Sequence, residues 1–276
     1  MEKGENLPPT QFETHALVQR RDVEGTFCHV VTNASGLFVN GVLCAPRSEI
    51  LGASISEPRA DGGCMVFLVR QNKTTSVPWY LDMPNRLESE QLLRAAGLAF
   101  DQHVLTIRLS EWTPRRVSVG SDGILLRGLL SRTFVAFPDI VEIDRPFNGF
   151  AIVDRNRGRV VVWESEVHWL ADLLAMRIFE GMRVHQALNH HVEPTLASAG
   201  TTYRANADNE SALEDVVIDS SRPLNVRVAA AKTLRVSKGE VGRERVRVLA
   251  STTVSPSARS ALERVARETA HEAARA

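Results

Sequence analysis

One short pattern of residues occurs twice in this chain, and it restricts the possible folds more than any other feature. The first copy reads SGLFVNGVLCAPRSEI from Ser35, and the second reads DGILLRGLLSRTFVAFPDI from Asp122. Both place a turn glycine before a short apolar run, then a second glycine, then an acidic residue and isoleucine before the next apolar run. An internal repeat of this kind predicts two domains with one fold.

The first of these domains is expected over residues 25–109. Runs rich in Val, Ile, Phe and Thr alternate there with turn residues, a pattern typical of an antiparallel meander of about five strands. The spacing then becomes helical in ESEQLLRAAG, where Gly97 stands at a position typical of a helix C-cap. Residues 103–109 alternate polar and apolar residues, as a half-buried strand does.

The second domain is expected over residues 110–191, again with strands first and a closing helix last. Asn156 and Gly158 accept the backbone conformation of a tight turn, so residues 151–163 predict a hairpin. Apolar residues at helical spacing predict an amphipathic helix over 166–185. The predicted fold class is therefore α+β, with two small antiparallel sheet or barrel domains, each closed by a helix, and an all-α segment after them.

The two ends of the chain differ from these domains. Residues 1–24 are polar and contain prolines, which predicts a flexible arm or at most an edge strand. After a polar linker over 192–207, residues 208–276 lose strand alternation and form four helical runs with alanine-rich faces. Pro223 and Pro256 stand at expected first-turn positions. We expect this helical segment to dock on the second sheet domain.

Composition limits the partners and the compartment. The 33 basic residues balance 33 acidic ones, so no overall field favours nucleic acid, and electrostatic recognition has to be local. The three cysteines, Cys28, Cys44 and Cys64, are widely spaced without nearby histidines, which is typical of reduced thiols. The N-terminus has charges and prolines where a signal peptide needs an apolar core. These features predict a cytoplasmic protein.

The repeat also carries a family resemblance. The segment RRVSVGSDGILLRGLLSRTFVAFPDIVEID, the hairpin after it and the helix ADLLAMRIFEGM resemble a bacterial pleckstrin-homology domain over residues 112–191. Residues 25–109 are similar but more diverged. PLNVRVAAAKTL and PSARSALERVA resemble the second helices of HEAT-type repeats, with Arg227 and Arg259 at the arginine positions. The resemblance implies tandem pleckstrin-homology-like domains followed by a short HEAT-like segment, and modules of both kinds bind partners.

Motifs for catalysis are missing from the sequence. It has no Gly-x-Ser-x-Gly elbow, phosphate loop, dinucleotide fingerprint or His-Glu-x-x-His, and Gly120-Ser-Asp-Gly123 is typical of a hairpin turn. His185, His190, His191 and Glu193 allow a metal site, but histidines at a helix C-terminus commonly interact with the helix dipole in solvent. We therefore expect no catalytic residue, no cofactor and no metal, and the chain is not expected to be an enzyme.

The candidate ligand-binding residues are five arginines: Arg155, Arg157 and Arg159 on the predicted hairpin, with Arg115 and Arg116 on the strand that begins the domain. Clustered guanidinium groups bind phosphate or carboxylate bidentately. The alternative interpretation is a solvated turn balanced by neighbouring acidic residues.

The function expected from all these features is non-enzymatic binding or scaffolding of a protein partner. Peripheral membrane or anionic-ligand binding through the basic hairpin is the first alternative. An enzyme of unrecognised type is the second. The oligomeric state and the identity of the partner stay open.

Overall fold

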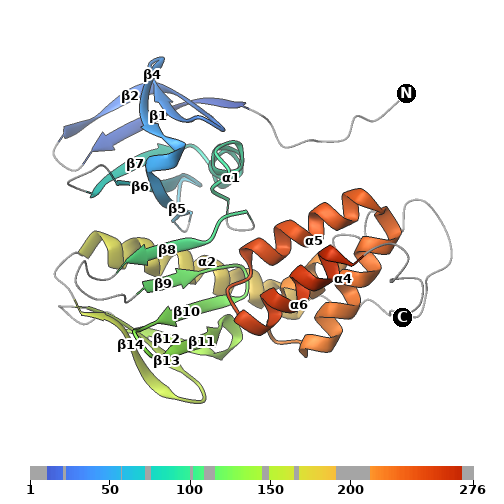
Figure 1. Ribbon diagram of the computed structural model, residues 1–276. Coiled ribbons are helices and arrows are strands. Elements are labelled where there is room, and N and C mark those ends of the chain that lie inside the picture. Colours follow the sequence, from blue (N-terminus) through green and yellow to red (C-terminus); the bar gives the residue numbers. More distant parts are fainter. Residues whose placement is uncertain are drawn as a thin grey trace. The chain divides into compact units, whose positions relative to one another are not determined.

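A computed structural model describes residues 11–20, 23–56, 58–71, 76–99, 102–108, 116–144, 149–164, 168–190 and 212–268 (Figure 1). The chain divides into unit 1, with residues 1–107 and 165–180, and unit 2, with residues 108–164 and 181–276. The fold is α+β, with antiparallel sheets followed by an all-α segment, as expected. In the described residues, no helix is long and apolar enough to cross a membrane.

Unit 1 contains a seven-stranded antiparallel sheet, which has the order β4-β3-β2-β1-β7-β6-β5. Its strands are β1 (Gln11–Arg20), β2 (Val23–Asn33), β3 (Gly36–Val39), β4 (Val42–Pro46), β5 (Ile50–Ile55), β6 (Cys64–Gln71) and β7 (Ser76–Met83). Helix α1 (Arg86–Ala95) contacts several of these strands and buries Leu92 and Leu93 in their core. Gly97, with φ +64°, follows the helix where a C-cap glycine was expected.

Within the N-terminal arm expected over residues 1–24, residues 11–20 form strand β1. Strand β1 lies inside the sheet and pairs with both β2 and β7. Ala16 and Val18 are buried in the core, while His15 and Leu17 alternate with them on the outer face. A strand covered on one face needs an apolar residue only at every second position, so the polar composition of this stretch concealed it.

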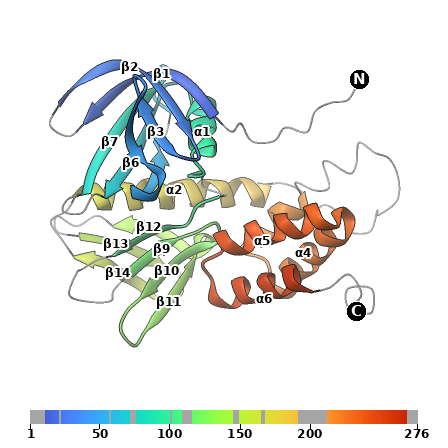
Figure 2. The ribbon, with the colours of Figure 1, turned by 45° about the horizontal axis from the view of Figure 1, so that its top comes forward.

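Unit 2 contains the remaining sheet structure except for residues 105–107, which begin the next strand and belong to unit 1 (Figure 2). One sheet has the order β11-β10-β9-β8 and the other has the order β12-β13-β14. Their strands are β8 (Leu105–Arg108), β9 (Arg116–Val119), β10 (Gly123–Arg127), β11 (Arg132–Ala136), β12 (Ile140–Asp144), β13 (Gly149–Asp154) and β14 (Gly158–Glu164). Helix α2 (His168–His190) follows the strands, and its residues from Gly181 onward belong to unit 2.

The repeated sequence forms the same local structure twice. In unit 1, β3 and β4 lead into the short helix η1 (Arg47–Glu49) and β5; in unit 2, β10 and β11 lead into η2 (Phe137–Asp139) and β12. The first glycine of each copy is required by its backbone. Gly36 and Gly123 have φ values of +140° and +155°, and an added Cβ would lie 2.2 Å and 2.3 Å from a carbonyl oxygen of the next strand. The repeat is confirmed at this level.

The all-α segment contains four helices within the described residues, as expected. They are a helix over 212–218, α4 (Leu224–Lys238), α5 (Glu240–Thr252) and α6 (Pro256–Arg267). Val217, Leu234, Val246 and Leu262 lie in their shared core. Pro256 begins α6 in the first turn, whereas Pro223 stands at the N-cap, one residue before α4.

Candidate functional site

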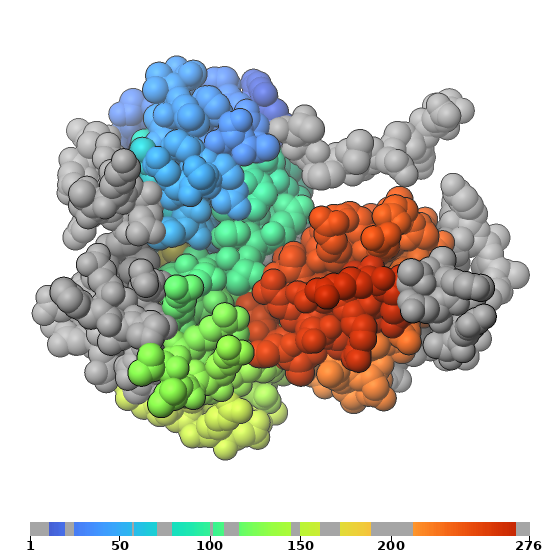
Figure 3. Space-filling view, viewed as in Figure 1, coloured from blue at the N-terminus to red at the C-terminus, as the bar shows by residue number. Residues whose placement is uncertain are grey.

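The turn between β9 and β10 docks the helical segment on the sheet of unit 2. Asp122 is fully buried and accepts hydrogen bonds from the backbone N–H groups of Val254, at 2.8 Å, and Ser255, at 3.3 Å. A guanidinium nitrogen of Arg227 lies 3.7 Å from the same carboxylate. Burial raises the pKa of Asp122, although the two N–H groups and the charge of Arg227 act to lower it. The expected docking is confirmed, and Figure 3 shows the surfaces of the two parts in contact.

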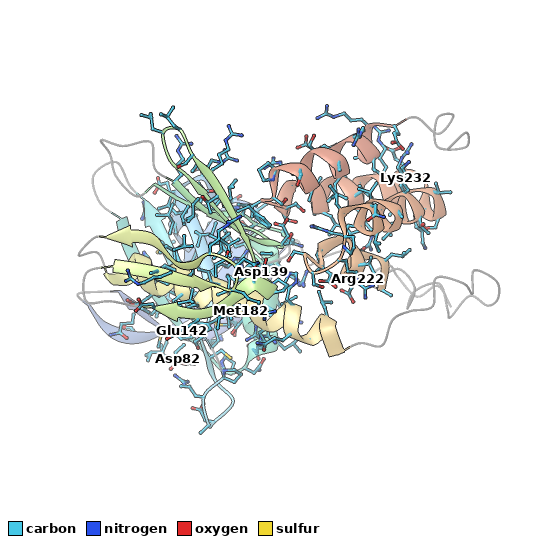
Figure 4. The ribbon with its side chains drawn as sticks, turned by 90° about the horizontal axis from the view of Figure 1, so that it is seen from below. Asp82, Asp139, Glu142, Met182, Arg222 and Lys232 are labelled. Carbon is cyan, nitrogen blue, oxygen red and sulfur yellow. The ribbon has the colours of Figure 1, made fainter. Side chains whose placement is uncertain are left out.

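His185 was expected to be exposed at a helix end, and this expectation is wrong. Helix α2 continues to His190, and His185 is buried, with Nε2 donating to the carbonyl of Ser121 at 3.0 Å. Its Nδ1 lies 3.8 Å from the carboxylate of Asp219, and Arg222, labelled in Figure 4, donates to that carboxylate at 3.1 Å. Burial acts to raise the pKa of Asp219, but the contacts with His185 and Ser221 hold it well below its usual value.

These buried groups stabilise the packing of unit 2. His191 and Glu193 lie outside the described residues, as does the side chain of His190. Among the residues that the structure describes, no three His, Cys, Asp or Glu side chains come together as metal ligands do. Asp122, His185 and Asp219 each contact another element of the same unit, so these groups join the sheet to the helices.

A second histidine with polar contacts, His103, is half-buried and belongs to unit 1. Its Nε2 donates to the carbonyl of Leu51 at 3.2 Å, and Arg47 approaches Nδ1 at 3.5 Å. Burial lowers the pKa of His103 to about 4, and the charges of Arg177 and Arg47 act in the same direction. The imidazole is therefore neutral at pH 7 and serves packing.

The predicted arginine hairpin is present between β13 and β14, but two of its guanidinium groups have partners. Arg157 Nη1 donates to the carbonyl of Phe134 at 2.8 Å, and Arg159 Nε donates to Asp144 at 2.7 Å. Arg155 is exposed in the turn, and Arg115 lies outside the described residues. The hairpin thus resembles the balanced turn that was the alternative interpretation.

Arg116 lies in a different cluster, which the sequence analysis did not identify. It pairs across the strands with Arg127, and Arg127 pairs on its other side with Arg132. All three side chains are exposed. None of them forms a salt bridge with a residue in the described part of the chain. Like charges placed directly opposite one another destabilise a sheet, so this arginine row has an energetic cost without an external anion.

Two leucines form the tip beyond the arginine row. The β10–β11 turn runs from Gly128 to Ser131 and is closed by a backbone hydrogen bond of 2.8 Å. Its central residues, Leu129 and Leu130, are 78% and 98% exposed. Such positions normally hold Gly, Asn, Asp, Ser or Pro. The sequence analysis did not single out these leucines, although the Arg-Gly and Ser-Arg pairs around them indicate a turn.

Unit 1 has a surface cavity of about 330 Å³ on the outer face of its sheet. Its lining comes from β1 and β2, from the β5–β6 loop and from the end of β7: His15, Leu17, Phe27, Arg59, Asp61, Gly63, Asp82, Met83 and Pro84. Leu17 and Phe27 are cross-strand partners, and Phe27 is 69% exposed. The sequence reading did not identify this cavity, because its walls come from segments distant in the chain.

Comparison with known proteins gives no family for this chain. No protein-family model matches it, and no curated protein matches its sequence.

Proposed function

We propose that this chain is a non-enzymatic binding protein and that unit 2 attaches it to an anionic lipid surface. One observation carries the proposal: Leu129 and Leu130 are exposed at a hairpin tip directly beyond the row formed by Arg116, Arg127 and Arg132. Apolar side chains that enter the acyl boundary, with basic groups at the headgroup level, are the usual combination in peripheral membrane attachment.

The expected strength is that of reversible binding. Full insertion of one leucine contributes about 1.5–3 kcal/mol, and one arginine near an anionic leaflet contributes about 1 kcal/mol. The two leucines and three arginines together give about 6–9 kcal/mol before the cost of immobilising the protein, which is several kcal/mol. Neither group alone is sufficient by this arithmetic, so binding requires both the tip and the arginine row.

Vesicle flotation with the full chain tests the proposal. Vesicles of phosphatidylcholine with phosphatidylserine should carry the wild-type chain at low salt, and vesicles of phosphatidylcholine alone should carry much less. Changing Leu129 and Leu130 to Ser should abolish flotation, and so should changing Arg127 and Arg132 to Ala.

Matched controls separate the tip from general surface effects. Leu87 on α1 is exposed, and so are Arg243 and Arg247 on α5. Leu87→Ser should leave flotation unchanged, and so should Arg243→Ala combined with Arg247→Ala. If the tip variant floats as well as the wild type, the proposal is wrong.

The assignment of the sheets and helices to known fold classes is part of this proposal. We place each sheet unit in the pleckstrin-homology-like class and the helical segment among HEAT-like arrays. The recurring strand–strand–short helix–strand arrangement supports the first assignment, and the proline-initiated α6 supports the second. A cytoplasmic location is part of the same proposal, supported by the absence of disulfide bonds at Cys28, Cys44 and Cys64.

A protein partner, the function expected first from the sequence, is the second candidate. The observation in its favour is the cavity on unit 1, with the exposed ring of Phe27 in its wall. We propose no reaction for this chain, because the shifted pKa values belong to the buried Asp122 and Asp219 and the half-buried His103, whose contacts join elements of the fold.

A further inference from the structure

We infer that the cavity on unit 1 binds a segment of a partner polypeptide that presents one large apolar side chain followed by a lysine or arginine. This inference deepens the second candidate function and is independent of lipid attachment through unit 2. It depends on three features of the cavity: an apolar wall, a preformed rim and an excess of negative charge at that rim.

The apolar wall follows from the register of β1 and β2. Leu17 pairs with Phe27 and His15 pairs with His29, so these side chains share the outer face of the sheet. The rings of His15 and Phe27 stack with centroids 5.9 Å apart. Stacking holds Phe27 in place although most of its surface is in solvent. An exposed, held aromatic ring in a concave wall is a favourable contact for an apolar side chain.

The rim is preformed by the β5–β6 loop. Arg59 makes two hydrogen bonds to the carboxylate of Asp82, at 3.0 Å and 2.6 Å. The loop closes on itself through a bond of 2.8 Å from the N–H of Arg59 to the carbonyl of Gly63. A Cβ at Gly63 would lie 2.5 Å from the Arg59 guanidinium, so a larger residue there would displace this side chain from its present position. A rim held before binding lowers the ordering cost of the complex.

The negative charge of the rim favours a basic residue next to the inserted apolar side chain of the partner. Arg59 is shared between Asp82 and Asp61, which leaves one net negative charge on the three groups. Arg59 Nε and the N–H of Gly63 both donate to Oδ1 of Asp61, and the Asp61 side chain is 68% exposed. The pKa of Asp61 is lowered, first by the N–H of Gly63, so the carboxylate is ionised at pH 7. A lysine or arginine next to the inserted side chain complements this carboxylate.

The volume favours a side chain over a cofactor. Cavities that hold small molecules range from about 300 to 1,000 Å³, and this cavity, at about 330 Å³, is at the small end. Its opening lies on a strand face, where an extended segment can lie across the surface while one side chain enters.

The test is selection of a phage-displayed library of random linear peptides against the full chain. Selected peptides should combine a large apolar residue with a following lysine or arginine. Fluorescence anisotropy with one labelled selected peptide should show at least about tenfold weaker binding to Phe27→Ala, the usual effect of losing an aromatic anchor. Asp61→Asn should weaken the basic peptide but not its analogue with Ser at the basic position.

Controls keep the result interpretable. Phe27→Ala removes a largely exposed ring, so its thermal unfolding should match the wild type, and Leu87→Ala should bind the peptide normally. Failure to select such peptides, or equal binding by the wild type and Phe27→Ala, overturns the inference. Self-association that Phe27→Ala abolishes also overturns it, because a second copy would then fill the cavity. Vesicle flotation should be the same for the wild type and Phe27→Ala. A failure of the peptide experiment therefore leaves the lipid proposal intact.

Discussion

Replacement of Asp122 by alanine should separate the helical segment from the sheet of unit 2. The buried carboxylate accepts two backbone hydrogen bonds, from Val254 and Ser255, and faces the buried guanidinium of Arg227. Its removal leaves two N–H groups without an acceptor and one cation without its counter-ion. Breaking a buried pair from one side costs about 3–5 kcal/mol, much of which is the cost of the group left behind.

Asp122→Asn is the matched control. The amide keeps one oxygen for the N–H of Val254 and removes a charge whose burial is unfavourable, as the raised pKa indicates. Its expected cost is about 1–2 kcal/mol. Urea unfolding measures both values, and hydrogen exchange at the amides of Val254 and Ser255 locates the change. An alanine variant within 1 kcal/mol of the wild type, with both amides still protected, would refute the reasoning.

Three other predictions concern single residues, two through stability and one through peptide binding. Gly36→Ala and Gly123→Ala should each lower the free energy of unfolding, measured in urea, by about 2–4 kcal/mol. Gly158→Ala should lower it by only about 1 kcal/mol, because Gly158 has φ +74° but no atom lies within 4 Å of an added Cβ. Equal losses would show that the two repeat positions do not specifically require glycine. His103 has a folded-state pKa of about 4 against 6.5 unfolded, so its contribution is complete above 6.5 and is lost as pH falls from 6.5 toward 4. His103→Gln should flatten that part of the stability curve, and an unchanged slope would count against a neutral His103 imidazole in the folded protein. Gly63→Ala should leave global stability nearly unchanged but weaken peptide binding at the unit 1 cavity, and stronger binding would argue against the preformed rim.

Several local features were predictable because they depend on neighbouring residues. The two turn glycines and the acidic-Ile pairs at Glu49 and Asp139 indicated the repeat, and both copies form the same strand and short-helix arrangement. The C-cap at Gly97 and the start of α6 at Pro256 also follow from nearest-neighbour chemistry.

Features that depend on distant segments could not be predicted. The pairing of Asp122 with Val254 joins residues far apart in sequence, so the turn was recognised but its burial was not. The arginine row requires knowledge of which strands are neighbours, since Arg116, Arg127 and Arg132 meet only across the sheet. Strand β1 was expected at most as an edge strand, because its apolar residues are few and most residues on its outer face are polar; it lies inside the sheet instead.

The most direct test of lipid attachment places a fluorophore at the hairpin tip. In the full chain with Cys44→Ser, the remaining Cys28 and Cys64 are buried, so Leu130→Cys can be labelled with an environment-sensitive dye. Attachment through the hairpin tip predicts a blue shift and higher emission with phosphatidylserine-containing vesicles, reversed by high salt because the arginine row is screened. The same dye at Leu87→Cys should not respond. An unchanged spectrum at position 130, with vesicles in excess and at low salt, would show that the tip does not enter the lipid.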